Sequence, residues 1–470
     1  MFFSDNKMTR WLVFDFRHVY RPLIPFVHKG IFYMFEENLI MANSEKWQRL
    51  AKTIGPGIMF AGTCIGGSHL LQSTKAGAFY GFGLLVIVLL ANFFKYPFFE
   101  FASRYTNATG DSILEGYRRL GKSPLVIYGV VTFFSMFIIT AAIFVFSAGL
   151  ASNIALSFFD LELSPFVWRA IMFGVVLALL SYGQFKVLDL ALKVIGIVLV
   201  LTVTIAFVSV VGKPMHQPSP GMFEIISTKA GFAFMVFLMG WMPMGVDMSA
   251  WHSIWTQERI KQTGYHPTLK ETLVDFKIGY FITVALAIFF LTIGAKVIFG
   301  VVSPETIKGL SGLGYAQTLV SAFTEAIGSW SEIVISLAAF ATMFGTALTL
   351  SDGYVRSMVR TLALLRTGKV EGDEKKSNYL IWLILMFAGS FGLITWITRE
   401  GSGVTFGDVM NLATGTSFVI APLAAYFNYK IIFNKEVPES HKPSKALKAL
   451  AQAGIIFLSI FTLGYFYVMM

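Results

Sequence analysis

Charged residues and cysteine are scarce in this sequence. Asp, Glu, Lys and Arg make up 14% of its 470 residues, whereas soluble globular proteins carry about 25%. The single cysteine, Cys64, excludes an intrachain disulfide and a zinc-ribbon arrangement. Hydrophobic residues make up 55% of the chain, and the mean hydropathy is +0.67. This composition argues against a soluble enzyme, a DNA-binding protein and a disordered scaffold, and it predicts an all-α polytopic membrane protein.

Sequence motifs of several enzyme and pump classes are also absent. The chain contains no HExxH, no GxxxxGK[ST] loop and no cluster of Cys and His, so membrane-bound zinc catalysis and ATP-driven transport lack their parts. We therefore expect no enzymatic activity and no resident cofactor. The net charge of +10 fits the basic cytoplasmic loops of a membrane protein better than nucleic-acid binding.

Apolar windows divide the chain into an N-terminal segment and a membrane domain. Residues 1–45 contain no run of about 20 apolar residues and no signal-peptide pattern, so we expect a cytoplasmic segment before a domain over 46–470. Eleven transmembrane helices are predicted in this domain, near 54–80, 82–103, 124–150, 166–183, 187–212, 231–256, 276–300, 330–352, 378–397, 404–429 and 447–468. A closed β-barrel would instead need short alternating strands, which the sequence does not show.

Basic residues gather in alternate loops and so predict the orientation. With the N-terminus placed inside, the inner segments hold twenty-three Lys and Arg residues and the outer segments six. Such an excess marks the cytoplasmic side of a membrane protein. We predict a protein of the plasma or inner membrane whose N-terminus is cytoplasmic and whose C-terminus lies outside.

Two of the predicted spans are interrupted near their middle. The first span contains Gly-Gly-Ser-His at 66–69, and the sixth contains GWMPMG at 240–245. Glycine and proline favour unwound backbone there. Because five spans separate the interruptions, five-helix repeats over 54–212 and 231–429 would be inverted relative to each other, with 447–468 as an eleventh helix. Paired interruptions of this kind are typical of the substrate site of secondary transporters. Ordinary helix kinks are the alternative, since Gly and Pro are common in membrane helices.

Several side chains near the interruptions could bind a substrate. An intramembrane histidine can bind metal, carry a proton or form a hydrogen bond, and a buried carboxylate can compensate a cation. Thiol and thioether groups suit late transition metals rather than Mg²⁺. The predicted substrate-binding residues are Cys64, Gly66, Gly67, Ser68, His69, Met242, Met244 and Asp247. The alternatives are helix packing for the histidine, methionines and cysteine, and a position already in water for Asp247.

Other polar residues of the predicted spans are candidates for coupling or gating. His252 lies near the inner mouth, where it could accept a proton, and Asp408 and Asn411 lie in the tenth span. A cap at the outer mouth is the alternative for these last two. Lys95 and Glu100 in the second span are expected to reach the inner interface or to pair with other charges.

Four stretches resemble the natural-resistance-associated macrophage protein (Nramp) family of proton-coupled divalent-metal transporters. They are GPGIMFAG, QSTKAGAFYGFGLL, ASRYTNATGDSILEGYRR and the Met-Pro of WMPMG. The resemblance covers roughly residues 50–430. It implies a LeuT-like fold with five-plus-five inverted repeats, interrupted first and sixth helices and an added eleventh helix. It also implies secondary active transport of a divalent cation by alternating access.

The sequence departs from this family at the expected metal ligands. Where the family carries Asp-Pro-Gly-Asn, residues 65–69 read Ile-Gly-Gly-Ser-His, and Met244 replaces the family's His. Met242 matches the metal-binding Met of the family. Together with Asp247 and His69, which are candidates as ionisable groups near the interruptions, it makes up the candidate metal ligands. A symporter of an amino acid or small organic anion on the same fold is the alternative, and a non-transporting membrane receptor is a further one. The expected partners are a small inorganic cation or small molecule and the lipid bilayer, without nucleic acid.

Overall fold

The computed structural model describes residues 45, 47–303, 305–306, 312–370, 376–399 and 403–470, with the backbone alone at 183–195, 312, 322, 326 and 469. The chain divides into two compact units, Met1–Ala51 and Lys52–Met470. The predicted N-terminal segment 1–45 lies almost entirely outside the described residues. All site residues predicted from the sequence belong to the second unit.

In the described part of the second unit the chain forms helices and no strand. In chain order the elements are α2 (Pro56–Cys64), η3 (Ile65–Ser73), α3 (Thr74–Tyr80), α4 (Leu85–Thr109), α5 (Ile113–Leu120), α6 (Lys122–Phe159), α7 (Pro165–Val211), α8 (Met222–Ile226), α9 (Lys229–Gly240), η4 (Val246–Met248), α10 (Ser249–Thr263), α11 (Leu269–Ile293), η5 (Gly294–Ile298), α13 (Gly312–Ile327), η6 (Ser329–Ser331), α14 (Glu332–Arg366), α15 (Lys376–Ile397), α16 (Phe406–Ile432), η7 (Glu439–His441) and α17 (Lys445–Met469).

Every apolar window predicted as a span contains helix, and the sixth is interrupted at 241–245. Eight helices of the described chain are long and apolar enough to cross a bilayer, and a bent pair ending at Tyr80 would make nine. Two shorter apolar helices, Gly196–Val211 and Lys229–Gly240, also lie within predicted spans. The all-α membrane fold is therefore confirmed, whereas eleven spans remain a prediction.

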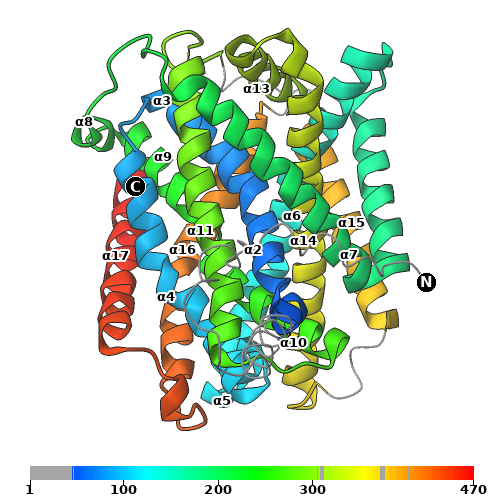
Figure 1. Cartoon of the computed structure of the whole chain (residues 1–470), viewed down its shortest axis with the longest axis vertical. Helices are drawn as coiled ribbons and strands as arrows, with labels where there is room; N and C mark the ends of the chain where they lie inside the picture. The colour runs from blue at the N-terminus through cyan, green and yellow to red at the C-terminus, as the bar shows by residue number, and fades with distance from the viewer. Residues whose placement is uncertain (1–44, 46, 304, 307–311, 371–375, 400–402) are drawn as a thin grey trace, which may run out of the picture. The chain divides into compact units, whose positions relative to one another are not determined.

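The predicted fourth and fifth spans form one helical element, α7. A straight helix of its 47 residues would be about 70 Å long, more than twice the thickness of a hydrocarbon core. Figure 1 shows that the element turns back on itself near the end where α10 lies. Its segments Pro165–Tyr182 and Gly196–Val211 are each apolar, so the turn separates two helical arms.

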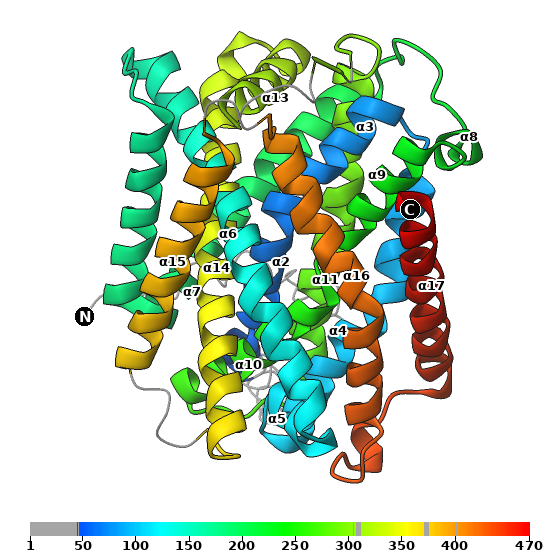
Figure 2. The same cartoon turned by 180° about the vertical axis from the view of Figure 1, so that it is seen from behind.

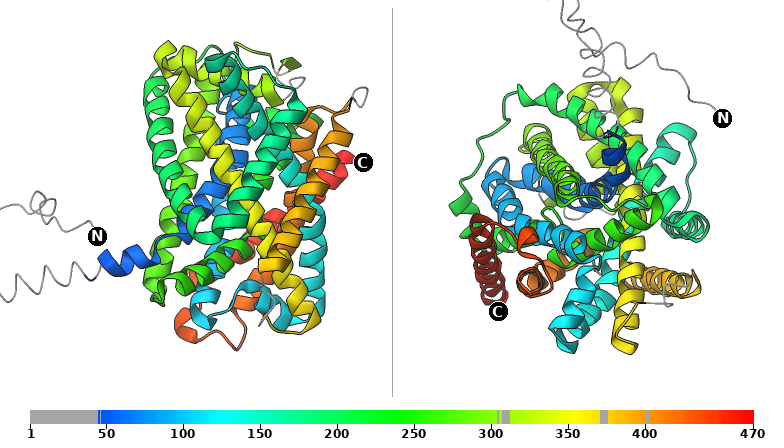
Figure 3. Two further views of the ribbon diagram at one scale, coloured as in Figure 1. Left: turned by 90° about the vertical axis from the view of Figure 1, so that its right-hand side faces the viewer. Right: turned by 60° about the horizontal axis from the view of Figure 1, so that its bottom comes forward.

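The first predicted span runs through the centre of the unit. The run from α2 to α3 packs against α11, α14 and α10, and Figure 2 shows α2 in the middle of the bundle, between the labels of α14 and α11. By contrast, α15 and α17 are among the least buried of the apolar helices and lie at opposite edges of the unit in Figure 3. Apolar side chains on these outer helices suit contact with lipid.

Loops that the basic residues predict to be on one side lie at one end of the unit. In Figure 1, α5, α10 and the connection between α16 and α17 are at the bottom, whereas α8 and α13 are at the top. Side-chain caps fix several helix starts at these ends: the hydroxyls of Thr268 and Thr405 accept hydrogen bonds from Glu271 N and Asp408 N, as in a capping box. The caps thus fix where α11 and α16 begin.

Candidate functional site

The sixth predicted span is interrupted where the sequence predicts it. Helix α9 ends at Gly240, residues 241–245 are not helical, and the chain resumes helical structure in η4 and α10. The Met242–Pro243 peptide bond is cis. At the end of α9, a Cβ on Gly240 would lie 2.1 Å from the Thr414 carbonyl oxygen of α16. Glycine is therefore required for the close approach of this half-helix to α16.

The first predicted span is interrupted in a different way. Residues 65–73 form a π-helix between α2 and α3, so the chain is helical from Pro56 to Tyr80. The prediction of unwound backbone at 66–69 is therefore wrong. Glycine permits unwinding but does not compel it, and the wider turns of a π-helix still pair the backbone groups, as in the bond from Thr74 N to His69 O. Such π-helical turns are frequent at functional sites.

Gly66 and Gly67 let neighbouring helices touch the π-helical backbone. A Cβ on Gly66 would lie 2.2 Å from Thr346 Oγ1 of α14, and a Cβ on Gly67 would lie 2.6 Å from the Trp241 indole. Both distances are too short for any side chain without a shift of the neighbour. The two interruptions are thus in direct contact through Gly67 and Trp241, as the inverted-repeat argument requires.

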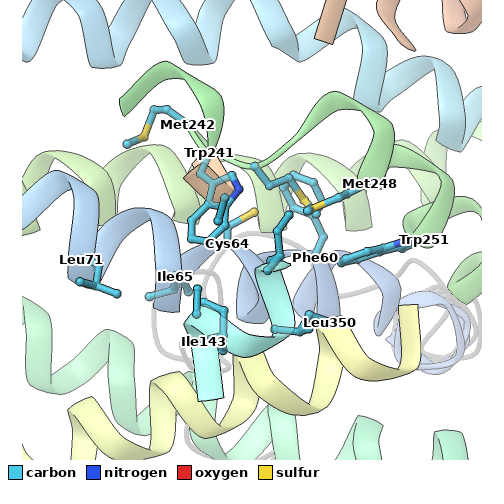
Figure 4. Packing of buried hydrophobic residues seen from close by; sticks show 14 of the residues in the cluster. Phe60, Cys64, Ile65, Leu71, Ile143, Trp241, Met242, Met248, Trp251 and Leu350 are labelled. Atoms are coloured by element: carbon cyan, nitrogen blue, oxygen red, sulfur yellow. The ribbon is translucent and has the colours of Figure 1, made fainter. Parts of the chain in front are cut away.

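A cavity of about 30 Å³ lies between the two interruptions. Its lining residues come from α2, η3, α6, α14 and the interrupted sixth span. They are Thr63, Cys64, Gly67, Ser68, Ile139, Ile143, Trp241, Pro243, Met244, Met248, Trp251, Thr346 and Leu350. Figure 4 shows Cys64, Trp241, Met248 and Trp251 around this space. Of the predicted substrate-binding residues, the structure brings Cys64, Gly67, Ser68 and Met244 to the cavity.

Sulfur atoms are a prominent chemical feature of the cavity. The lining includes the thiol of Cys64 and the thioethers of Met244 and Met248. Met242, the methionine that the family resemblance indicates, is fully buried but is not among the lining residues, and in Figure 4 its side chain extends away from Cys64 and Met248. Met248 lines the cavity instead.

Asp247 is buried beside the interruption of the sixth span. Its side chain is 4% exposed, and its Oδ1 atom has no hydrogen-bond partner within the described residues. A Cβ on Gly245 would lie 2.6 Å from this oxygen, so the glycine leaves it uncovered. A buried carboxylate oxygen without a partner is costly, which makes it a candidate cation ligand. The described residues contain no group of three or more His, Cys, Asp or Glu side chains that could hold a metal ion.

His69 connects the π-helix to α11 and does not line the cavity. Its Nε2 atom lies 2.7 Å from the Thr283 carbonyl oxygen and therefore donates to it. Its Nδ1 atom contacts the Ser68 hydroxyl, and the oxygen of that hydroxyl also contacts the Cys64 carbonyl; the single hydroxyl proton can be donated to one of these two acceptors at a time. The histidine is thus a buried connector between two central helices, next to the cavity-lining Ser68.

The structure places the three predicted coupling or gating residues in different surroundings. His252 is buried against the rings of Phe60 and Phe276, with Nδ1 3.2 Å from Ser103 Oγ. Asp408 is exposed and accepts hydrogen bonds from Thr405 at the start of α16, which is the capping alternative. Asn411 is half-buried. None of the three lines the cavity.

Lys95 is a site residue that the sequence argument missed. It was expected to reach the inner interface or to pair, but it is fully buried. Its ammonium donates to the carbonyls of Met239, Gly240 and Met244, all at the interruption of the sixth span. Glu100 does pair, with Arg104 at 2.6 Å. A lone lysine in the middle of an apolar run was the available signal, since such residues are costly in a bilayer.

Solved structures share this fold. A manganese transporter of Eremococcus coleocola has a TM-score of 0.65 at 14% identity, covering 94% of this chain and 88% of the other. MhsT in complex with L-phenylalanine has a TM-score of 0.60 at 10% identity, covering 88% and 98%. At these identities the likeness concerns the fold. The chain is an integral membrane protein with the LeuT-like fold of secondary transporters.

Within this class the chain belongs to one family. The profile described as "Natural resistance-associated macrophage protein-like" matches residues 57–468, and the protein is a member of that family. The resemblance inferred from four short stretches is thereby confirmed. An uncharacterised protein of Pasteurella multocida (strain Pm70) is 33% identical over 422 residues, which are 89% of this chain and 92% of the relative.

Proposed function

We propose that this protein is a secondary active transporter of divalent metal cations that works by alternating access. The observation that carries the proposal is the cavity shared by the π-helical first span and the interrupted sixth span. Paired irregular helices at mid-membrane are where transporters of this fold bind substrate. Family membership and the manganese transporter named in a structural neighbour support a metal ion as the substrate.

The groups around the cavity suit a soft divalent cation. Thiolate and thioether donors favour late transition metals, and the cavity presents the sulfur atoms of Cys64, Met244 and Met248. Asp247 would supply the negative charge, because its buried Oδ1 has no other partner among the described residues. The sulfur atoms favour a soft ion such as Cd²⁺, and the Asp247 carboxylate also suits Mn²⁺. We therefore assign these two ions to the site in preference to Mg²⁺, for which sulfur is a poor ligand.

The cavity volume argues against the amino-acid alternative. About 30 Å³ accommodates a water molecule or a bare ion, whereas sites for organic ligands measure about 300–1,000 Å³. An amino acid would require a much wider separation of Trp241 from Gly67 than the structure has.

Polar contacts at the end with the basic loops would close the site from that side. Trp255 Nε1 of α10 donates to Asp352 of α14 at 3.0 Å, and Arg356 joins Asp352 to Glu258 of α10 at 2.8 and 3.4 Å. Opening would separate α10 from α14 and break these bonds. We assign this end to the cytoplasm, with the C-terminus outside, because of the excess of Lys and Arg in its loops. The inverted repeats 54–212 and 231–429 are proposed as the units that rock against each other.

Uptake by purified protein tests the proposal. Full-length protein in proteoliposomes is expected to take up Mn²⁺, and Asp247→Asn is expected to lower uptake on the order of tenfold or more, since a charged ligand is lost. Asp408→Asn is the matched control, because Asp408 is an exposed helix cap. Absence of Mn²⁺ and Cd²⁺ flux from folded protein, or equal uptake by both variants, contradicts the proposal. Amino-acid uptake that persists in a metal chelator would favour the alternative.

A further inference from the structure

The interruption of the sixth span holds an ammonium group in a cage of backbone oxygens. Lys95 Nζ lies 2.5 Å from Met239 O, 3.0 Å from Gly240 O and 3.2 Å from Met244 O. An ammonium has three N–H donors, so these contacts use its full donor capacity. The lysine reaches the interruption from another helix, α4.

Two of these carbonyls belong to the last residues of α9. The C-terminal end of a helix carries a partial negative charge and favours cations. In transporters with discontinuous helices, unwound carbonyls and half-helix C-terminal ends coordinate a dissociable ion such as Na⁺. Lys95 supplies a positive charge to the same kind of ligand set, but the charge is covalently attached to the protein.

The interruption of the sixth span also carries one buried carboxylate, Asp247, which can compensate the positive charge of Lys95. Lys95 interacts electrostatically with Asp247, and both residues are buried. A buried ammonium is costly in a membrane unless it is paired and hydrogen-bonded. Lys95 therefore stabilises the non-helical segment and at the same time sets the net charge next to the cavity.

We propose that the Lys95 ammonium is a built-in monovalent cation, which occupies the position that a bound Na⁺ would take, so that the interruption keeps its shape without a dissociable monovalent ion. As a consequence, wild-type transport does not require Na⁺ or K⁺. This consequence rests on the proposed transport function, whereas the cation-binding statement does not.

Chemical rescue of Lys95→Ala tests the cation-binding statement without transport. Thermal unfolding of purified full-length protein would be followed in choline, sodium or n-propylammonium chloride at equal ionic strength. Wild type is expected to unfold at the same temperature in all three salts. Lys95→Ala is expected to unfold at a lower temperature in choline, and to be stabilised in a dose-dependent way by sodium or n-propylammonium. Lys445→Ala, which removes an exposed lysine at the start of α17, serves as the control and should show no such stabilisation.

Uptake measurements test the consequence in parallel. In choline, Lys95→Ala is expected to lose on the order of tenfold or more of its Mn²⁺ uptake, since three charge-assisted hydrogen bonds are lost, and the small cations should restore it. If Lys95→Ala folds but neither its unfolding temperature nor its uptake changes when sodium or n-propylammonium is added, the proposal is overturned. If Lys95→Ala does not fold in choline, it is prepared in n-propylammonium chloride; recovery of folded protein in that salt supports the proposal, and recovery in neither sodium nor n-propylammonium overturns it.

Uptake by the wild-type protein can be measured whether or not a Lys95 variant folds. Mn²⁺ uptake by wild type that depends on sodium overturns the proposal. Wild-type uptake that is equal in sodium, potassium and choline, together with uptake by Lys95→Ala that depends on a small cation, supports it. If wild type transports no divalent ion but Lys95→Ala is stabilised by small cations, the proposed function fails while the built-in cation stands.

Discussion

Gly67 of the first span lies directly against the indole of Trp241 in the sixth. A Cβ at Gly67 would be 2.6 Å from the Trp241 ring, so the two interrupted spans meet at a point where only hydrogen fits. Gly67 belongs to a π-helix and Trp241 follows the last residue of α9. This contact forms one wall of the cavity.

Gly67→Ala is therefore expected to reduce Mn²⁺ uptake at least tenfold, because the Trp241 indole must move into or across the cavity. Uptake in proteoliposomes, normalised to the amount of folded protein, measures this effect. Gly392→Ala is the control, since no atom lies within 4 Å of a Cβ at that position in the described structure. Equal uptake by the two variants would show that the contact has no role in transport.

Methionine variants test which methionine binds the metal: Met244 or Met248, which line the cavity, or Met242, which the family resemblance indicates. Met244→Leu and Met248→Leu keep the side-chain volume but remove a thioether from the cavity lining. Each is expected to weaken inhibition of Mn²⁺ uptake by Cd²⁺ several-fold, because Cd²⁺ is the softer ion. Met242→Leu is expected to leave inhibition unchanged, since Met242 does not line the cavity. The reverse order of effects would assign the metal to Met242.

Asp352→Asn is expected to open the site toward the end with the basic loops. The substitution removes the charged acceptor of the Trp255 N–H of α10 and of the Arg356 guanidinium. The hydrogen bond between α10 and α14 is thereby weakened, and Arg356, which also pairs with Glu258 of α10, loses its partner within α14. Labelling of Cys64 by a membrane-impermeant thiol reagent applied to inside-out vesicles should become several-fold faster. Glu100→Gln is a suitable comparison, because Glu100 pairs with Tyr96 and Arg104 of its own helix. If Cys64 in Asp352→Asn is labelled at the wild-type rate, the contacts of Asp352 do not close the site.

His69→Leu is expected to destabilise the protein by about 1–3 kcal/mol, the usual loss when buried hydrogen-bonding groups are left unpaired. The Thr283 carbonyl and the Ser68 hydroxyl both lose the imidazole. Thermal unfolding of the purified variant measures the effect. His216→Leu, at an exposed position between α7 and α8, should unfold like wild type.

Hydropathy was sufficient to predict the helices and the position of the second interruption. A bilayer demands long apolar helices, and Pro243 within GWMPMG prevents a regular helix, so both features follow from local sequence. The loop pattern of basic residues likewise placed α5 and the end of α10 at one end of the unit, where Figure 1 shows them.

The interior of the site was less predictable because it depends on contacts between distant segments. Gly66 and Gly67 permit either unwinding or a π-helix, and the close approach of Thr346 and Trp241 is visible only in three dimensions. Thr346 and Met248 enter the cavity from positions that no motif distinguishes. Lys95 bonds to carbonyls about 145 residues away in sequence, which no local pattern contains.

Protection of Cys64 is the most direct test of the central claim that the cation binds between the two interrupted spans. Cys64 is the single cysteine of the chain and lines the cavity, so alkylation by N-ethylmaleimide reports on this place in the unmodified protein. Mn²⁺ or Cd²⁺ is expected to slow the reaction of Cys64 several-fold, and Asp247→Asn is expected to abolish the protection. A rate of alkylation that does not change with either ion would contradict the account.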